Sequence, residues 1–468
     1  MTQILLQGFN KLHRSVALEP SNIINMVPVL NPGGKRTEKA YFLRPGSIEL
    51  GSGSGSVVRG GISNKKATEA YVVVDTTLYT VTSAGVRTSR GSVSSMAGTD
   101  QVMMVQIEDG IFMTDGGASY WYVPSTATLT EVTDGQFTGA STVTEMDNYI
   151  IASTPSSRQW SISNSGLGSA WEALDFASIE TEANEEIVAV AANDRNLYIF
   201  GNTSTEVWYN SGDTFPFDRR EFFPHGCAAK SSIGRMEEYL YLLVKTEYGR
   251  PFVGRIKGYE MEDISGPINS EIGQYDVIND AIAFVLSQEG ETYFILSFPT
   301  ENKTWVYCHL AKEWVQWKNT AGNYYSASCS FMLGNKSVIG DRLSHRLYDV
   351  SFDNLNDNAV TFDWDIYTPA VYSDNMRINN VRLQADIEAG IGTGAGDNPE
   401  LTLNVSRDGG YTYGNDLTRT AGESASYTNR VQWWRLGQSR IFNYHLSGTS
   451  GRKWRFLSLS GDFQVGGR

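Results

Sequence analysis

The sequence has few of the residues that would mark a redox, metal-binding or disulfide-stabilised protein. Its 468 residues include only three cysteines and five histidines. Three scattered thiols are too few for a disulfide framework or for a four-ligand zinc site, and no two histidines stand three or four residues apart. We therefore expect buried thiols in a reducing compartment, no metal site and no cofactor.

Long apolar runs and helical patterns are also scarce. No stretch approaches the roughly 20 apolar residues that a membrane helix needs, and Met1–Leu12 lacks the apolar core and cleavage site of a signal peptide. By contrast, the chain contains 46 glycines and 12% aromatic residues. This composition is typical of many short strands joined by tight turns. We expect an all-β chain without a membrane span.

Positive charge is in deficit, since 38 Lys and Arg face 52 Asp and Glu and the formal net charge is −14. A nucleic-acid binder would carry a basic stripe. The acids are concentrated in residues 145–193 and the bases in residues 429–468. These are either two solvated faces or an acidic and a basic surface available for pairing with another subunit or for repelling a polyanion. The candidate acids for a DNA-channel or partner-facing surface are Glu180, Glu182, Glu185 and Glu186.

One short phrase recurs between Tyr71 and Val350: a polar or acidic turn, then an aliphatic–aromatic pair that starts a strand. Its residues alternate in polarity, which predicts strands and not helices. A spacing of about 40–50 residues is that of a β-propeller blade, and the drift in spacing fits six or seven blades equally well. The copies are separated by 33, 38, 48, 43, 53 and 54 residues, counted from Leu78, Ile111, Tyr149, Leu197, Leu240, Tyr293 and Leu347.

The composition changes twice along the chain. Residues 1–61 are rich in Pro and Gly and predict an extended arm that packs on a neighbouring subunit or ring protein. Residues 62–351 form the predicted propeller, and residues 352–468 have long alternating strands typical of a C-terminal β-sandwich. The candidate interface residues are Phe9, Ile23, Met26 and Phe42 in the arm, with Trp433, Trp434 and Arg435 near the C-terminus.

No motif for catalysis or nucleotide binding is present. Residues 32–37 lack the first glycine of a phosphate loop, and no Gly-x-Ser-x-Gly elbow occurs. Residues 406–413 match the Asp-box of sialidase-like propellers, which is a turn device and not a catalytic site. A glycosidase needs two carboxylates roughly 5–10 Å apart across a cleft, and nothing in the sequence marks such a pair. We predict no catalytic residue and no enzyme activity.

Several short segments, in a fixed order over nearly the whole chain, carry a family resemblance. They are Asn25-Met-Val-Pro28 with Tyr41-Phe-Leu-Arg44-Pro45-Gly46, Arg59-Gly-Gly61, Arg158-Gln-Trp-Ser161, Leu197-Tyr-Ile-Phe-Gly201 running into Ser204-Thr-Glu206-Val-Trp-Tyr209, Ser406-Arg-Asp-Gly409 and Trp433-Trp-Arg435-Leu-Gly437. In these segments the chain resembles the tail hub protein of short-tailed bacteriophages, also called the packaged-DNA stabilisation protein.

The resemblance implies a structural virion protein, made in the host cytoplasm and placed in the tail. Six copies would form a ring below the portal and its adaptor ring. That ring would continue the channel for double-stranded DNA, retain the packaged DNA, and carry the tail spikes or fibres and the tail needle or plug. An acidic wall would repel phosphates and let DNA slide.

A different class of protein is also compatible with the residues. The Asp-box and the abundance of aromatic residues fit a phage or bacterial propeller that binds or degrades carbohydrate. A monomer that depolymerises a surface polysaccharide would favour that alternative, whereas a ring that assembles only on an adaptor would favour the hub. A propeller scaffold of a cellular complex is a third possibility.

Overall fold

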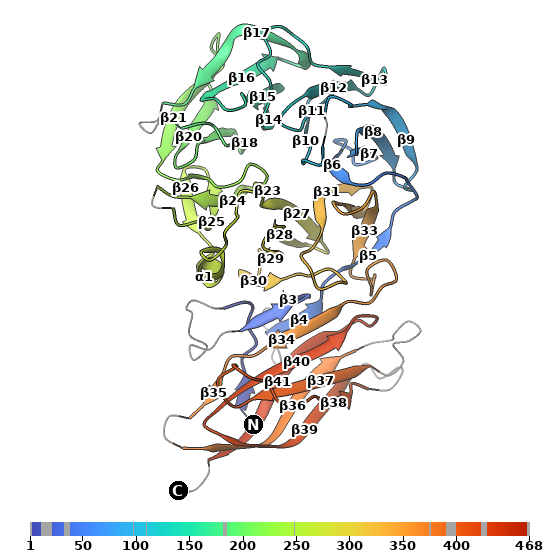
Figure 1. Cartoon of the computed structure of the whole chain (residues 1–468), viewed down its shortest axis with the longest axis vertical. Coiled ribbons are helices and arrows are strands. Elements are labelled where there is room, and N and C mark those ends of the chain that lie inside the picture. The colour runs from blue at the N-terminus through green and yellow to red at the C-terminus, as the bar shows by residue number, and fades with distance from the viewer. Residues whose placement is uncertain are drawn as a thin grey trace.

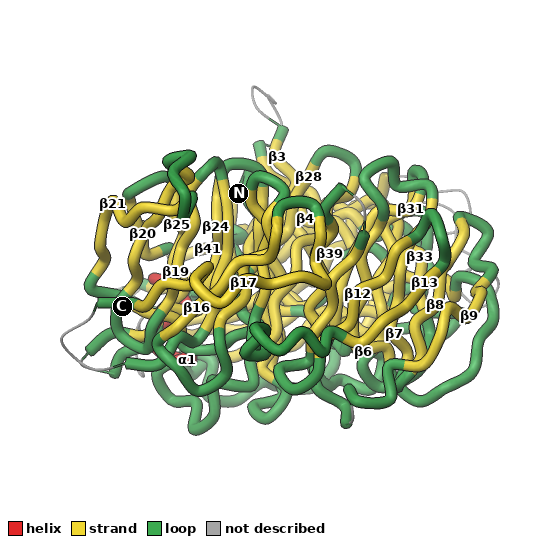
Figure 2. The backbone as a smooth tube through the Cα atoms, turned by 90° about the horizontal axis from the view of Figure 1, so that it is seen from above, coloured by secondary structure: helices red, strands yellow, loops and turns green. Residues whose placement is uncertain are grey.

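The computed structural model describes residues 2–10, 21–31, 38–96, 98–108, 110–180, 185–247, 249–373, 376–389, 399–422 and 428–465. These residues build two lobes, a propeller and a β-sandwich stacked along the long axis of the molecule (Figure 1). Strands and loops make up nearly all of the described chain (Figure 2). The described helices are one turn, α1 (Asn269–Ile272), and the 3-10 turn before it (Gly266–Ile268).

The propeller has seven blades, so the prediction of six or seven is confirmed at the higher number. The first blade consists of β6 (Val58–Ser63), β7 (Glu69–Val74), β8 (Thr77–Thr82) and β9 (Arg87–Ser92), and the second of β10 (Met103–Gln106), β11 (Ile111–Thr114), β12 (Ser119–Val123) and β13 (Thr128–Glu131). The third consists of β14 (Val143–Met146), β15 (Tyr149–Ser153), β16 (Gln159–Asn164) and β17 (Leu167–Ser178), and the fourth of β18 (Ala189–Asn193), β19 (Asn196–Phe200), β20 (Thr205–Asn210) and β21 (Phe217–Phe223). In the fifth, β22 (Gly226–Cys227) and β23 (Gly234–Met236) both pair with β24 (Tyr239–Lys245), which is followed by β25 (Phe252–Lys257) and β26 (Glu260–Asp263), and the sixth consists of β27 (Ile282–Gln288), β28 (Glu291–Phe298), β29 (Lys303–Cys308) and β30 (Glu313–Gln316).

The seventh blade closes the ring by combining strands from distant parts of the chain. Its first three strands are β31 (Ala327–Leu333), β32 (Lys336–Asp341) and β33 (Leu347–Ser351), and its outer strand is β5 (Gly46–Glu49). The register pairs Tyr348 with Glu49 and Val350 with Ser47. The innermost strand β31 in turn contacts β6 of the first blade. Residues 46–49, which were predicted to belong to the arm, therefore hold the propeller closed.

The recurring phrase marks hairpin turns inside the blades. In five blades it leads into the second strand of the sheet, and in the first and seventh blades it leads into the third strand, β8 and β33. The acidic turn residue takes a positive φ of 46–52° in five copies, namely Asp75, Asp147, Asp194, Glu237 and Glu289. Tight hairpins need this conformation because it matches the right-handed twist of the flanking strands, and Asp tolerates it better than most residues.

The sandwich is built from both ends of the chain. One sheet has the order β3 (Met26–Leu30), β4 (Lys39–Leu43), β41 (Arg455–Val465), β36 (Ile378–Glu388), β39 (Thr428–Ser439), and β1 (Thr2–Ile4) also pairs with β41. The facing sheet has the order β2 (Asn22–Ile24), β34 (Asp363–Tyr367), β40 (Ile441–Thr449), β37 (Glu400–Ser406), β38 (Leu417–Thr420), with β35 (Val371–Tyr372) beside β40.

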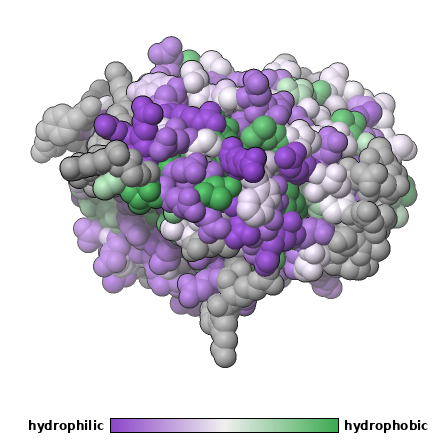
Figure 3. All heavy atoms as spheres, turned by 90° about the horizontal axis from the view of Figure 1, so that it is seen from below, coloured by the Kyte–Doolittle hydropathy of each residue, from purple (hydrophilic) through white to green (hydrophobic). Residues whose placement is uncertain are grey.

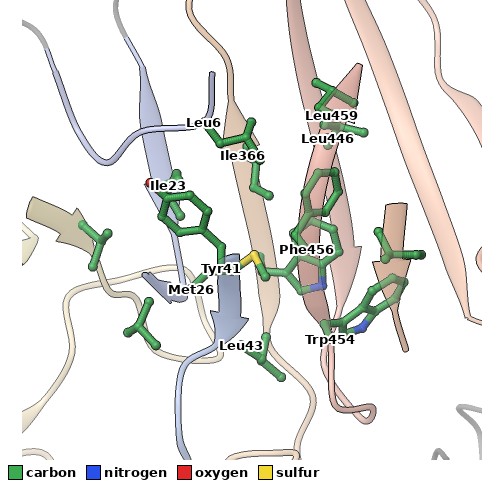
Figure 4. Packing of buried hydrophobic residues seen from close by; sticks show 14 of the residues in the cluster. Leu6, Ile23, Met26, Tyr41, Leu43, Ile366, Leu446, Trp454, Phe456 and Leu459 are labelled. Atoms are coloured by element: carbon green, nitrogen blue, oxygen red, sulfur yellow. The ribbon is translucent and has the colours of Figure 1, made fainter. Parts of the chain in front are cut away.

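The two lobes share one continuous sheet. Strand β2 pairs in parallel with β30 of the sixth blade through Ile24 and Gln316, and antiparallel with β34 of the sandwich. One hydrophobic core accordingly runs from blade six into the sandwich. Figure 4 shows Ile23, Met26 and Tyr41 pointing toward Trp454 and Phe456 of the C-terminal strands.

Two buried arginines connect neighbouring parts of the fold through ion pairs and hydrogen bonds. Arg44 pairs with Asp357 (Nη2–Oδ2 2.6 Å and Nη1–Oδ1 3.2 Å) and donates to Asn25 Oδ1 (3.0 Å) and to the carbonyl of Lys318 (3.0 Å). Its guanidinium lies 3.8 Å from the ring centroid of Phe362. Since these partners come from both lobes and from the linker between them, Arg44 ties the propeller to the sandwich.

The second buried arginine, Arg59, connects the first blade to the second. Its Nη2 lies 3.0 Å from Asp115 Oδ2, and Nη1 donates to the carbonyl of Met96 (2.6 Å). The following Gly60 has no room for a side chain, since a Cβ there would lie 2.1 Å from the carbonyl oxygen of Val102. The segment Arg59-Gly-Gly61 therefore belongs to the packing between blades.

The N-terminal segment requires a correction. Residues 1–61 were predicted to be an arm that packs on another subunit, but their described strands pair within their own chain, in both sandwich sheets and in the seventh blade. The three cysteines are buried thiols, as predicted. Burial raises the pKa of both Cys227 and Cys329 to about 11, which keeps these thiols protonated and unreactive at neutral pH.

Candidate interaction surfaces

The acidic stretch lies on the rim of the third and fourth blades and is only partly free. Glu180 follows the outer strand β17, and its carboxylate is 2.8 Å from Nη2 of Arg219 on β21. Its backbone N–H donates to the buried carboxylate of Glu206 (2.7 Å), which also pairs with Arg219 (3.2 Å). The charge of Glu180 is therefore partly matched, although 73% of its side chain is exposed.

Glu185 does not belong to an exposed acidic surface, which corrects that prediction. It is buried, and its carboxylate accepts hydrogen bonds from the backbone N–H (2.8 Å) and hydroxyl (2.5 Å) of Thr203. Gly201 permits this approach, because a Cβ there would lie 2.5 Å from Glu185 Oε2. Glu186 is exposed, and Glu182 lies outside the described residues.

The contrast between Glu185 and Glu186 gives a direct prediction. Replacing Glu185 by glutamine should lower the free energy of unfolding by about 1 kcal/mol, because a neutral amide oxygen is a weaker acceptor than a carboxylate for the N–H of Thr203. Replacing the neighbouring Glu186 by glutamine is the matched control and should leave stability unchanged. Urea denaturation of both variants measures the difference. Equal stability of the two variants would contradict the role given to Glu185.

The predicted interface residues divide between the core and the surface. Trp434 is 55% exposed and Arg435 is exposed, whereas Phe42 is half-buried beneath the guanidinium of Arg455 (4.8 Å). The other four are buried in their own chain and are not available to a neighbour. Phe9 packs against Trp305 with ring centroids 4.5 Å apart, and Ile23, Met26 and Trp433 lie in the shared core.

The basic C-terminal stretch is largely neutralised within the chain. Arg430 pairs with Asp386 (3.0 Å), Lys453 with Asp353 (2.7 Å) and Arg455 with Glu388 (3.2 Å). Arg452 is buried. The broad basic face suggested by the sequence is thus reduced to a smaller set of arginines at the end of the sandwich.

The Asp-box-like segment is a closed turn, as the sequence indicated. Ser406 donates to Asp408 Oδ1 (2.7 Å), and the N–H (3.0 Å) and hydroxyl (2.6 Å) of Thr412 donate to the same carboxylate. The hydrogen bonds from Thr412 and Ser406 hold the pKa of Asp408 well below its usual range. Both carboxylate oxygens of Asp408 accept hydrogen bonds within the turn, so this side chain has a structural use.

The hollow on the propeller axis has one carboxylate in its lining, whereas a glycosidase needs two. A cavity of about 840 Å3 occupies the propeller axis between the inner strands, and its charged lining consists of Lys65, Lys230, Arg235 and Glu145. Among the described residues, no group of three or more His, Cys, Asp or Glu side chains is placed to hold a metal ion. Sequence reasoning missed that Glu145 reaches this axis, because no local pattern reports which strand of a blade lies innermost.

Two family models match this arrangement of lobes. The model of the bacteriophage P22 Gp10 β-propeller matches residues 2–354, and that of the Gp10 β-sandwich matches residues 363–460. The chain belongs to the bacteriophage P22 Gp10 family. It is therefore a structural tail hub protein of the short-tailed phage type, as its sequence resemblance predicted. The Gp10 propeller match begins at residue 2, whereas in this structure β1, β3 and β4 pair in the sandwich and β2 joins the two lobes.

No curated protein matches the chain. Among solved structures, the Neurospora crassa Pan2 WD40 domain has 8% identity over 67% of this chain and 95% of its own, with a TM-score of 0.42. The N-terminal domain of Nup159 has 6% identity over 70% of this chain and 99% of its own, with a TM-score of 0.40. Scores this low add nothing to the assignment. No described helix is long and apolar enough to span a membrane.

Proposed function

We propose that six copies of this chain form a ring below the portal and its adaptor ring, where they continue the DNA channel and retain the packaged genome. The observation that carries the proposal is the match of both lobes, in order, to the Gp10 family. The ring would also anchor the tail spikes or fibres and the needle or plug. Strand β2 supports such a role because its backbone hydrogen bonds join the two lobes into one sheet, which can transmit a mechanical force from one lobe to the other.

Assembly on a template tests the proposal. Purified chain mixed with the adaptor ring of its own phage should give particles with six added copies in mass photometry, whereas the chain alone should not form a closed ring. A chain that stays monomeric with the adaptor ring present would contradict the proposal.

The exposed acids support a repulsive channel wall. Glu180 and Glu186 remain at the surface, and carboxylates facing the lumen would prevent phosphates from sticking. Replacing both by lysine should create attraction to phosphate and slow DNA ejection in particles that assemble normally. The defect should weaken at high salt, because screening reduces phosphate binding. Ejection at the native rate in low salt would mean that these acids do not face DNA. Glu185 is excluded from this test because its replacement disturbs the fold.

A carbohydrate-degrading role has one observation in its favour. Asp363, Asp365 and Glu400 line a hollow of about 530 Å3 on the sandwich sheet, and Asp365 Oδ1 lies 2.8 Å from His445 Nε2. We nevertheless expect no release of reducing sugar from host envelope polysaccharide. Steady release that is abolished by Asp363→Asn or Glu400→Gln, and retained in Asp408→Asn, would establish the enzyme instead.

A further inference from the structure

The end of the sandwich farthest from the propeller presents a cluster of exposed apolar side chains. We define this distal tip as residues 371–373, 376–382, 405–413, 434–443 and 460–465, which strand pairing brings together: Tyr372 with Ile441, and Ile378 with both Ser439 and Val465. Figure 3 views this end and shows hydrophobic side chains among hydrophilic ones. Five large apolar side chains there are 39–68% exposed: Tyr372, Met376, Tyr411, Trp434 and Val465.

The same tip is basic in an acidic protein. Its described residues include five arginines against two aspartates. One arginine, Arg382, is paired with Asp462 (2.7 Å), and the other aspartate, Asp408, is occupied by its own turn. The four remaining arginines are exposed and make no ion pair with any residue that the structure describes: Arg377, Arg407, Arg435 and Arg440.

Strand pairing and side-chain contacts hold several of these residues in place. A bulge separates the Arg382–Trp434 pairing from the Asn380–Gly437 pairing, and Arg435 in this bulge has a φ of 59°. The Asp-box turn is fastened to it, because Arg407 Nη2 donates to the carbonyl of Leu436 (2.7 Å). Trp434 is held from below by the guanidinium of Arg382, 5.1 Å from its ring. A surface that is already ordered loses little conformational entropy when it binds.

We infer that the distal tip is a docking surface for a carboxylate-rich patch on another protein. Tyr, Trp, Met and Arg are the residues enriched at the centres of protein interfaces, where Lys and Glu are depleted, and the described tip contains neither Lys nor Glu. Arginine forks bind carboxylates in bidentate fashion. The inference rests on the proposed function for one point only, that the acidic partner is a different protein of the same tail.

The test uses the full chain and particles of its phage that lack the hub. The tip variants are Arg435→Glu/Arg440→Glu and Trp434→Ala. The control is Arg195→Glu/Arg250→Glu on exposed propeller loops, which makes the same charge change and, like the tip pair, includes one residue of positive φ, since φ is 61° at Arg195. Circular dichroism checks that all variants are folded. Uptake onto particles is measured by co-sedimentation.

A photo-crosslinking residue in place of Tyr411 identifies what the tip touches in assembled tails. We expect a crosslink to an acidic segment of a different tail protein, and at least about tenfold weaker uptake for each tip variant, the loss typical of a hot-spot residue. The control should bind like the wild type. Wild-type uptake by both tip variants would overturn the inference while the proposed function stands, whereas failure of the wild type to add would count against the proposed function itself.

Nucleic acid and anionic membranes are two other partners that an arginine-rich surface could bind, and both are tested with the same variants. A 30-base-pair DNA duplex and vesicles of phosphatidylglycerol are probed with the wild type and the tip variants at physiological salt, and no binding is expected. Binding of either probe that disappears in Arg435→Glu/Arg440→Glu, together with no protein crosslink from position 411, would show that the tip serves nucleic acid or membrane and would overturn the assignment of a protein partner.

Discussion

Replacing Arg44 by methionine is expected to lower the free energy of unfolding by about 3–5 kcal/mol, the cost of removing one partner of a buried ion pair. Methionine keeps much of the volume but removes the positive charge beside Asp357 and the guanidinium donors to the side-chain carbonyl of Asn25 and the carbonyl of Lys318. These acceptors come from both lobes. We therefore expect the sandwich and the propeller to unfold together in the wild type and in two separate transitions in the variant.

Guanidinium denaturation followed separately by fluorescence and circular dichroism measures this effect. The exposed variant Arg435→Met is the control and should unfold like the wild type. The double variant Arg44→Met/Asp357→Asn should recover part of the loss, because it removes the uncompensated carboxylate. An Arg44→Met protein as stable as the control would show that Arg44 does not hold the lobes together.

Deletion of residues 1–34 is expected to have a still larger effect. It removes β1, β2 and β3, and with them the strand that joins β30 to β34. Full burial of an apolar side chain contributes about 1.5–3 kcal/mol, so the summed loss approaches the whole stability of a typical domain, about 5–15 kcal/mol. Among the described residues of the deleted segment, seven apolar side chains are buried: Ile4, Leu6, Phe9, Ile23, Ile24, Met26 and Val27.

Limited proteolysis of the truncated chain distinguishes the possible roles of this segment. We expect rapid cleavage within residues 363–460 and in the linker before them, while β5 remains available to close the propeller. A truncated chain with wild-type thermal stability that fails only in assembly would restore the original interpretation of an arm packed on a neighbour.

The blades could be predicted from the sequence because their signal is local. Five of the seven copies of the recurring phrase place an acidic residue at the positive-φ position of a hairpin, as Asp147 and Asp194 illustrate. The same holds for the Asp-box turn, whose partners lie within a few residues of Asp408. Short-range backbone geometry leaves its mark on residue choice, so such elements are visible without a structure.

The N-terminal strands could not be placed for the opposite reason. Ile24 pairs with Gln316, and Arg44 pairs with Asp357, so their partners stand about 300 residues away in the sequence. Pro and Gly between the short strands resemble a linker until those partners are known. Glu185 is a similar case, because its burial depends on Thr203 and on the missing side chain of Gly201. For Trp433 and Trp434, strand alternation predicts that one points inward, but not which.

A cryo-EM reconstruction of the tail of its phage is the most direct test of whether this chain forms the hub. We expect six copies of a seven-bladed propeller joined to a sandwich, arranged as one ring directly below the adaptor and around the DNA channel. A tail in which this chain lies outside the channel, as a peripheral fibre or a single copy, would show that it is not the hub.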